Sequence, residues 1–319
     1  MKNKNILVVS YSQSGQLDAI LKSLLSPLYE SDTINIVHKY ISPKIVYPFP
    51  WSFMKFMDLF PECVYLDPCE IENIENDEIE YDLIILAYQV WFLSPSIPMT
   101  SFLKSEYARK KLSHKPVITL IGCRNMWIMA QEKMKSMLND IGAKLIDNIV
   151  LIDQGNSLAT FITTPRWMFT GKKDSLWKIF PKAGISDEDI RFSSRFGKAI
   201  LKGLLENKKQ NNTSFCHGLG AVCVNEKLIR SEQIGIKSFH IWGKIIRKIG
   251  KVGDIKRKPI VLLYLFFLIL MIITVVPINM IVQTINRKIN KNKVNLQKEY
   301  YELPSGSSRE RIKEFSQNE

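Results

Sequence analysis

The chain has 319 residues, of which 46% are hydrophobic, so it can bury a full core and its composition does not indicate disorder. Its formal net charge is +13, and most of the excess positive charge lies beyond Ser231. Because these basic residues flank a long apolar segment, anionic membrane lipid matches them better than nucleic acid, and no nucleic-acid partner is predicted.

Five continuous apolar runs alternate with helical patterns, which is typical of a parallel sheet covered on both faces. The predicted strands lie at residues 6–9, 34–40, 82–87, 116–121 and 144–152. The predicted helices lie at residues 16–29, 99–112, 126–141 and 186–205. The alternation implies right-handed crossovers, so we predict a doubly wound five-stranded α/β domain over residues 1–206.

Residues 42–79 interrupt this alternation. They contain YPFPW at positions 47–51, and then Phe53, Phe56 and Phe60. Two interpretations stay open for this apolar insertion. It would cover a pocket or a homodimer interface, or it would be an ordinary packed excursion.

A polar stretch at residues 207–214 is predicted to end the domain and to begin a linker that runs to residue 237. Residues 238–258 then form an amphipathic pattern, with Phe239, Trp242 and Ile246 on one face and lysines and arginines on the other. This pattern is typical of a helix that lies in a membrane interface.

Residues 259–282 contain no charged side chain and are long enough to cross a bilayer once. Basic residues stand on both sides, so the positive-inside rule does not fix the orientation. The short N-terminal apolar run does not match a signal peptide, so the N-terminal domain is expected in the cytoplasm at the cytoplasmic membrane. Residues 283–319 form a polar C-terminal tail, of which residues 300–319 are expected to be outside and disordered.

The segment SYSQSGQL, residues 10–17, carries the first chemical signal. Ser12, Ser14 and Gly15 follow a buried strand, and a helix begins immediately afterwards. Backbone N–H groups, the helix dipole and the serine hydroxyls can then hold a phosphate without a lysine. A nucleoside triphosphate loop would need GK followed by Ser or Thr, and a dinucleotide site would need G-x-G-x-x-G; neither occurs there.

A strand, S-x-S-G-x and a helix in this order resemble the FMN phosphate loop of flavodoxins. The resemblance implies a flavodoxin-like fold with FMN as cofactor. It assigns the phosphate to Ser12, Gln13, Ser14, Gly15 and Gln16. Leu17 departs from the pattern, which usually has a hydroxyl there, so only its backbone N–H would contact the phosphate.

The segment AYQVWFLSPSIP, residues 87–98, is similar to the flavin loop of FMN-dependent quinone and NAD(P)H reductases of this fold. Ligands of this topology bind at the carboxyl ends of the strands, where the strand order reverses. The resemblance implies cofactor contacts from Tyr88, Gln89, Val90 and Trp91, with Tyr88 or Trp91 stacked on the flavin ring. Both aromatics could instead belong to the core.

The segment GCRNMW, residues 122–127, follows the fourth strand at the same end of the sheet. Gly122 would let the backbone approach the flavin, with Cys123 beside it. Arg124 would stabilise negative charge on the reduced ring or on a substrate oxygen, and Asn125 would bond a ring edge. Residues 153–167 are predicted as an irregular stretch that shapes the substrate pocket or is an ordinary connection.

These motifs, together with TTPRW at residues 163–167 and the C-terminal apolar segment, resemble the bacterial dialkylresorcinol condensing enzymes of dialkylresorcinol and flexirubin-type pigment biosynthesis. The resemblance implies FMN-dependent aromatisation of a dialkylcyclohexanedione that a partner ketosynthase makes. An electron donor or acceptor would be a further partner. Tyr88 is the candidate base and Arg124 the candidate anion-stabilising residue.

Other functions stay open. The chain would also suit a membrane-tethered flavodoxin-type electron carrier, an NAD(P)H:quinone reductase, or a flavin-free scaffold, which Leu17 supports. A deep apolar pocket lined by Trp51, Trp91, Trp127 and Trp167 would favour the enzyme.

The five cysteines are scattered and odd in number, which indicates free thiols in a reducing compartment. Only Cys216, His217 and Cys223 suggest a metal cluster, and their spacing is a poor match, so no metal site is predicted.

Overall fold

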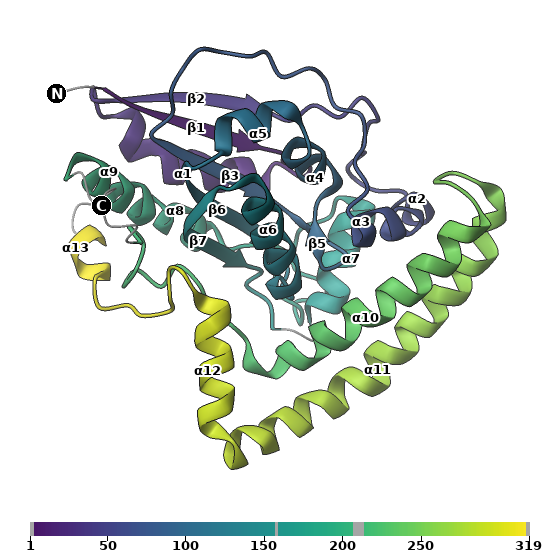
Figure 1. The fold of residues 1–319 in the computed structure, drawn as a ribbon. Coiled ribbons are helices and arrows are strands. Elements are labelled where there is room, and N and C mark those ends of the chain that lie inside the picture. Colours follow the sequence, from purple (N-terminus) through teal and green to yellow (C-terminus); the bar gives the residue numbers. More distant parts are fainter. Residues whose placement is uncertain (1–2, 157–158, 207–213, 317–319) are drawn as a thin grey trace.

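The computed structural model describes residues 3–156, 159–206 and 214–316. Its centre is a five-stranded parallel sheet (Figure 1) in the order β2–β1–β3–β6–β7. Counted along the chain, these five strands follow the order 2-1-3-4-5, in which the chain reverses direction across the sheet between the first and third strands. The fold is flavodoxin-like. The strands are β1 (Lys4–Ser10), β2 (Ile34–Tyr40), β3 (Leu83–Tyr88), β6 (Pro116–Cys123) and β7 (Lys144–Ile152).

Helices cover both faces of the sheet (Figure 1), so the central strands are buried on both sides and read as continuous apolar runs. One layer contains α1 (Gln16–Tyr29), α8 (Asp187–Phe192) and α9 (Ser194–Leu205), and the other contains α4 (Ile97–Leu103), α5 (Glu106–Leu112) and α6 (Ile128–Ile141). The predicted doubly wound α/β architecture is confirmed.

Two predicted helices are each divided. The helix predicted at residues 99–112 is α4 and α5, because Ser105 begins a new helix by accepting a hydrogen bond from Ala108 N at 3.1 Å. The helix predicted at residues 186–205 is α8 and α9, which meet at Ser193. Ser186 caps α8 by accepting a hydrogen bond from Asp189 N at 3.0 Å.

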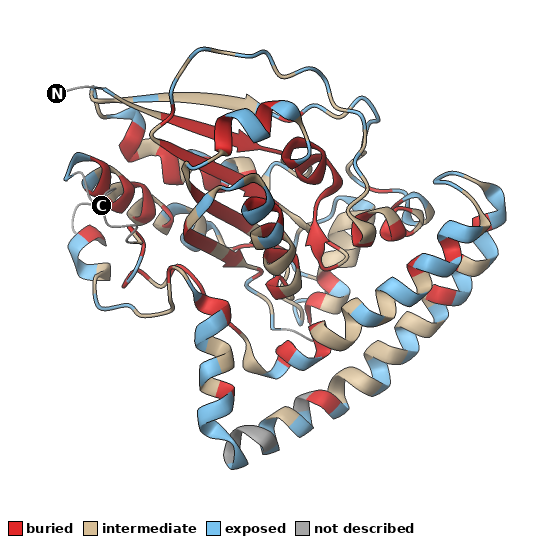
Figure 2. Ribbon diagram, viewed as in Figure 1, coloured by how far each residue is buried: buried red, intermediate tan, exposed pale blue. Residues whose placement is uncertain are grey.

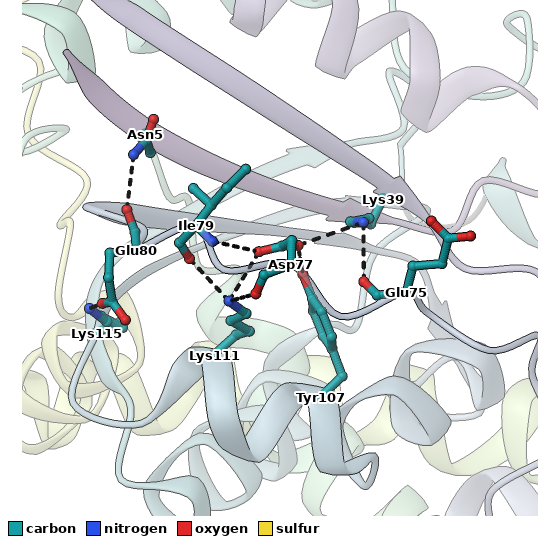
Figure 3. Close-up of polar contacts among 9 residues, drawn as sticks. All are labelled: Asn5, Lys39, Glu75, Asp77, Ile79, Glu80, Tyr107, Lys111 and Lys115. Atoms are coloured by element: carbon teal, nitrogen blue, oxygen red, sulfur yellow. Dashed lines mark hydrogen bonds and ion pairs between the residues drawn. The ribbon is translucent and has the colours of Figure 1, made fainter.

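The insertion forms α2 (Phe53–Asp58) and α3 (Phe60–Tyr65), and then a long segment without helix that returns to β3. Figure 3 shows how this segment is fastened: the Asp77 carboxylate lies 3.0 Å from Lys111 Nζ and accepts from Tyr107 Oη at 2.9 Å. Partial burial acts to raise the pKa of Asp77, but these hydrogen bonds outweigh it and lower the pKa. The segment is therefore part of the rigid body despite its polar sequence.

Beyond the sheet, α10 (Glu226–Ile249) and α11 (Lys258–Ile289) form an antiparallel hairpin, with the short 3₁₀ turn η2 (Ile255–Arg257) at its tip (Figure 1). The predicted linker is wrong from residue 226 onward, because Asn225 caps α10 by accepting from Lys227 N. Residues 207–213 lie outside the described part of the chain. By length and composition alone, α11 contains a segment that could cross a membrane.

The tail prediction is also wrong where the structure describes it. After α11 the chain forms α12 (Lys291–Glu302) and α13 (Ile312–Ser316), and it packs back on the α/β domain. Ser305 is fully buried and donates to the Asp147 carboxylate of β7 at 2.6 Å. Residues 215–224 are also largely buried, so the domain does not end at residue 206.

Candidate functional site

A cleft of about 150 Å³ lies at the carboxyl ends of β1, β3, β6 and β7, where ligands of this topology bind. Its walls bring together residues from the predicted segments after the first, third and fourth strands. The cleft is lined by Gln13, Ser14, Gln16, Leu17, Phe49, Phe56, Gln89, Val90, Trp91, Gly122, Cys123, Arg124, Asp153, Thr164, Trp167, Met168 and Gly184.

The loop between β1 and α1 has the form of an anion cradle. Gly15 has φ +78°, and no atom lies within 4 Å of the position that its Cβ would occupy. The first helical N–H groups of α1 follow it without a side-chain cap. The Ser12 Oγ is buried and has no hydrogen-bond partner within the described part of the chain. Unpaired donors at a helix N-terminus favour an anion such as phosphate.

The side chains of Gln13 and Gln16 fix the loop to its surroundings. Gln13 Nε2 donates to Pro48 O at 3.1 Å, which joins the loop to the insertion. With the amide of Gln16 oriented to satisfy its neighbours, Oε1 accepts from Ile185 N at 3.0 Å and from Lys173 Nζ at 3.2 Å. Their side chains therefore hold the loop in place, which leaves phosphate contacts to the backbone and the serines.

Gly122 lines the cleft and also packs closely against α1. A Cβ there would lie 3.3 Å from Leu17 Cδ1 and 3.2 Å from Ile20 Cδ1, so the missing side chain lets β6 approach α1. Leu17 is itself 1% exposed and belongs to the core. This packing explains why an apolar residue stands where the flavodoxin pattern has a hydroxyl.

Tyr88 is not in the cleft, and its predicted roles as base and stacking residue are corrected. Its side chain is fully buried in the sheet layer facing α6, and its Oη donates to Gln131 Oε1 at 2.7 Å. Burial raises the pKa of this phenol well above its ordinary value. The Tyr88 hydroxyl therefore has a structural partner and no path to a ligand in the cleft.

The next three residues do reach the cleft. Gln89, Val90 and Trp91 line it, and they lead into the two-residue strands β4 (Val90–Trp91) and β5 (Ser94–Pro95). The Gln89 Oε1 is buried without a hydrogen-bond partner. Trp91 packs edge-on against Trp51, with ring centroids 5.7 Å apart, and against Tyr47 at 5.3 Å. The indole is therefore held rigidly at the cleft wall.

The four predicted tryptophans separate into two groups. Trp91 and Trp167 line the cleft, whereas Trp51 supports Trp91 from behind. Trp127 is buried at the start of α6 and does not line it. The insertion contributes Phe49, which packs edge-on against Trp167 at 5.7 Å, so the insertion covers one side of the cleft.

Arg124 is the charged residue at the centre of the site. Its guanidinium lies 4.0 Å from the Phe161 ring centroid, and burial lowers its pKa to about 10, so it stays protonated at neutral pH. The neighbouring Cys123 thiol lines the cleft, and burial raises its pKa, which keeps it neutral. Burial also raises the pKa of Asp153, whose carboxylate accepts from the backbone N–H groups of Gly155 and Gly184.

A second, apolar pocket of about 260 Å³ adjoins the cleft. Val90 and Arg124 line both, and Asn125 lines only the apolar pocket. Its far wall comes from α10 and α11, including Phe239, Phe267, Leu268, Met271, Ile272, Val275 and Val276. The chain therefore places a guanidinium between a polar cleft and an apolar chamber.

Sequence reasoning missed a helix here, and it missed Met168 and Lys173 as residues of the site. The stretch predicted as irregular contains α7 (Thr160–Thr170), although Pro165 lies inside it. Thr164, Trp167 and Met168 of this helix line the cleft. Lys173, just beyond α7, donates a hydrogen bond to Gln16 and places a positive charge there. No sequence motif around Lys173 indicates this contact.

The described residues contain no group of three His, Cys, Asp or Glu side chains placed to hold a metal ion. In the suspected cluster, Cys216 is buried and Cys223 is exposed, so the two thiols face different environments.

Comparison with solved structures finds flavoproteins. A flavoprotein from Lactobacillus acidophilus NCFM, in complex with FMN, matches at 18% identity over 46% of this chain and 93% of that chain, with a TM-score of 0.36. Oxidised flavodoxin 1 from Bacillus cereus matches at 15% identity over 62% and 98%, with a TM-score of 0.34. RosB with its bound intermediate OHC-RP matches at 11% identity over 70% and 92%, with a TM-score of 0.30.

No protein-family model matches the sequence, and no curated protein matches it. None of these comparisons links the chain to the dialkylresorcinol condensing enzymes.

Proposed function

We propose that the cleft binds FMN and that the protein is a membrane-attached oxidoreductase for a substrate with a long apolar part. The observation that carries this proposal is the shared wall between the two cavities. Val90 and Arg124 face both the cleft beside the phosphate loop and the chamber lined by α10 and α11. A redox cofactor and an apolar substrate would meet at this wall.

The residues of the cleft fit FMN. The unpaired Ser12 hydroxyl, the open space at Gly15 and the N-terminus of α1 suit the phosphate. Lys173, next to Gln16, adds a positive charge beside the loop. The unpaired Gln89 Oε1 can accept a hydrogen bond from the ring system, and Trp91 offers an apolar wall. FMN bound here would supply a two-electron acceptor.

The chain's own residues would position the substrate and stabilise charge. Protonated Arg124 lies where it can hold an enolate oxygen, and its partly apolar surroundings strengthen that attraction. Phe49, Phe56 and Trp167 line the cleft and would limit the contact of a bound ring system with water. Among the groups described above, neither Tyr88 nor neutral Cys123 is suited to remove a proton, so the substrate's own acidity carries more of that step.

Oxidation of a dialkylcyclohexanedione to a dialkylresorcinol is the specific reaction we propose within this class. The substrate loses two hydrogens, its ring becomes aromatic, and both alkyl chains stay attached. An acidic dione head group suits Arg124, and its alkyl chains suit the apolar chamber. Transfer of the alkyl chains from water into lipid is favourable by about 0.8 kcal/mol per methylene, so such a substrate would be concentrated in the membrane. An enzyme attached to the membrane would meet the substrate there.

An electron carrier is the competing function, and one observation weighs against it. A carrier exchanges electrons through an exposed flavin edge, whereas here Phe49 of the insertion and Trp167 of α7 pack together over the cleft. A carrier also has no use for the adjoining apolar chamber.

Narrowing the chamber tests the proposal. Val275→Trp on the inner face of α11 should raise KM for a long-chain 2,5-dialkylcyclohexane-1,3-dione about tenfold or more and leave KM for a methyl-substituted analogue unchanged, since each excluded methylene forfeits about 0.8 kcal/mol. The matched control is Ile273→Trp, on the exposed face of the same helix. Resorcinol formation is the readout. Equal effects of both variants, or no oxidation of any dione by flavin-loaded protein, would reject the proposal.

A further inference from the structure

The position of the C-terminal segment decides how α11 can meet a membrane. Ser305 donates to the Asp147 carboxylate at 2.6 Å and accepts from the Asn148 backbone N–H at 2.7 Å. Gly220 N donates to Ser308 O at 2.7 Å. These contacts lie along the free edge of β7, so the segment after α11 completes the same domain that precedes it. A buried carboxylate would lose a partner if this segment stood elsewhere.

The start of α11 is fastened to that domain as well. Arg257, directly before the helix, is fully buried and places both terminal nitrogens on the Glu62 carboxylate at 3.0 and 3.1 Å. It also donates to Asp58 O at 2.8 Å. About two turns further on, Tyr264 stacks on Phe60 with ring centroids 4.2 Å apart. The chain directly before α11 and the chain after α12 are therefore both held by one domain.

These two attachments are incompatible with a transmembrane span. The 32 residues of α11 extend about 48 Å, more than the roughly 30 Å of a hydrocarbon core. If α11 crossed the membrane, Arg257 and Ser305 would stand on opposite sides, yet both contact the same folded domain. The single-pass topology predicted from the sequence conflicts with this arrangement.

The two faces of α11 are different, which a membrane-spanning helix in lipid would not require. One face packs on α10 and lines the apolar chamber. The other is an exposed apolar stripe at helical spacing, whose members are about half exposed or more (Figure 2). We define this lipid-facing stripe as Leu262, Leu263, Phe266, Ile269, Leu270, Ile273, Ile278, Ile281 and Ile285.

Charge at both ends of the stripe suits a membrane surface. Lys251, Lys256 and Lys258 are exposed near its start, and Lys291 and Lys293 are exposed after its end. Lysines placed in this way can reach anionic head groups while the apolar residues between them enter the acyl boundary. Contact with a second protein subunit would not require lysines at both ends of the stripe.

We propose that the α10–α11 hairpin lies flat in one leaflet of an anionic membrane, with the α/β domain and the C-terminus on the same side. This inference deepens the proposed membrane attachment and does not depend on FMN. In this arrangement the stripe enters the leaflet, and the opposite face of α11 forms the chamber wall. A lipid-dissolved substrate then reaches the site from the membrane plane.

The topology can be tested with epitope tags at both ends of the full chain. In sealed spheroplasts, protease should leave both tags intact, and in inside-out vesicles it should remove both. Cleavage of the C-terminal tag in spheroplasts while the N-terminal tag survives would establish a span and overturn the inference.

The stripe can be tested with a double variant, Phe266→Glu with Ile273→Glu. It should move from the membrane pellet to the soluble fraction and bind vesicles of phosphatidylcholine with phosphatidylglycerol at least tenfold more weakly than the wild type. Tyr29→Glu, an equally exposed site at the far end of α1, should stay on membranes.

Flavin content separates this inference from the cofactor proposal. A released double variant with the wild-type flavin ratio supports both, and a released variant of a wild type that never holds flavin rejects only the cofactor. A soluble wild-type dimer that buries the stripe, or a double variant that remains on membranes, would contradict the inference.

Discussion

The Ser12 hydroxyl is buried at the N-terminus of α1 and has no hydrogen-bond partner within the described chain. A buried polar atom without a partner costs free energy, and proteins retain such atoms where a ligand satisfies them. Gln89 Oε1 presents the same situation on the neighbouring loop. At the scale of single residues, these two atoms are the clearest trace of the ligand.

Ser12→Ala should weaken FMN binding by about tenfold or more, because a hydrogen bond to a charged phosphate contributes about 1.5–3 kcal/mol. The flavin-free variant should be at least as stable as the wild type, because the buried hydroxyl has no hydrogen-bond partner among the described residues. Fluorescence titration with FMN measures the first effect and thermal unfolding the second. Ser31→Ala, at the other end of α1, is the control. Unchanged FMN affinity would remove Ser12 from the site.

Arg124 is expected to act on charge rather than on shape. Arg124→Met keeps much of the contact with Phe161 but removes the guanidinium between the two cavities. We expect kcat for dione oxidation to fall about 100-fold, as for other single groups that stabilise a developing anion, with bound FMN retained. Arg124→Lys should recover part of the loss. Wild-type turnover by the Met variant would show that Arg124 has no such role.

At the scale of elements, the sheet and its loops could be predicted because continuous apolar runs report burial on both faces. Other features depend on contacts distant in sequence. The apolar run at residues 85–88 does not indicate that Tyr88 faces Gln131 of α6. The loop sequence at residues 14–16 does not indicate that the following Leu17 packs on Gly122. The helix α7 was missed because Pro165 and its threonines are read as breakers, although tertiary packing holds them in a helix.

Glu232 gives the α10 element a pH dependence. Its carboxylate accepts from Met129 N at 3.0 Å and joins α10 to the start of α6, and burial raises its pKa to about 8 from an ordinary 4.5. The unfolded chain therefore loses this proton at lower pH than the folded one. The contribution of Glu232 to stability should be full below about pH 4.5 and should fall towards pH 8, by up to about 1.4 kcal/mol per pH unit.

Glu232→Gln should flatten this dependence, because the amide oxygen can still accept from Met129 while the titrating proton is gone. Unfolding midpoints between pH 5 and pH 8 would show it, with Glu188→Gln, an exposed carboxyl on α8, as the control. A variant that loses stability with pH as steeply as the wild type would contradict the assignment.

At the scale of the whole molecule, the C-terminal segment closes the edge of the sheet. Ser305 Oγ accepts from the Asn148 N–H, and the Val150 N–H donates to Ala221 O, in the segment before α10, at 2.8 Å. The two segments together leave β7 without a free edge there. This role could not be predicted from the sequence of the tail, because a few hydrogen bonds from single residues produce no repeating pattern of apolar and polar residues. Composition alone therefore predicted disorder where the chain is structural.

Ser305→Ala should lower the free energy of unfolding by about 1–3 kcal/mol, since it removes a donor from the buried Asp147 carboxylate. It should also make residues 303–316 more sensitive to protease in the folded protein. Ser308→Ala, whose hydroxyl bonds only the exposed Glu310, is the matched control. Equal stability of the two variants would argue against a structural tail.

Titration of flavin-stripped protein with FMN and with riboflavin tests whether the loop after β1 holds the phosphate of a flavin nucleotide. We predict saturable binding of one FMN per chain, with riboflavin, which lacks the phosphate, bound at least about 100-fold more weakly. Equal affinity for the two flavins, or no saturable binding of FMN, would contradict it.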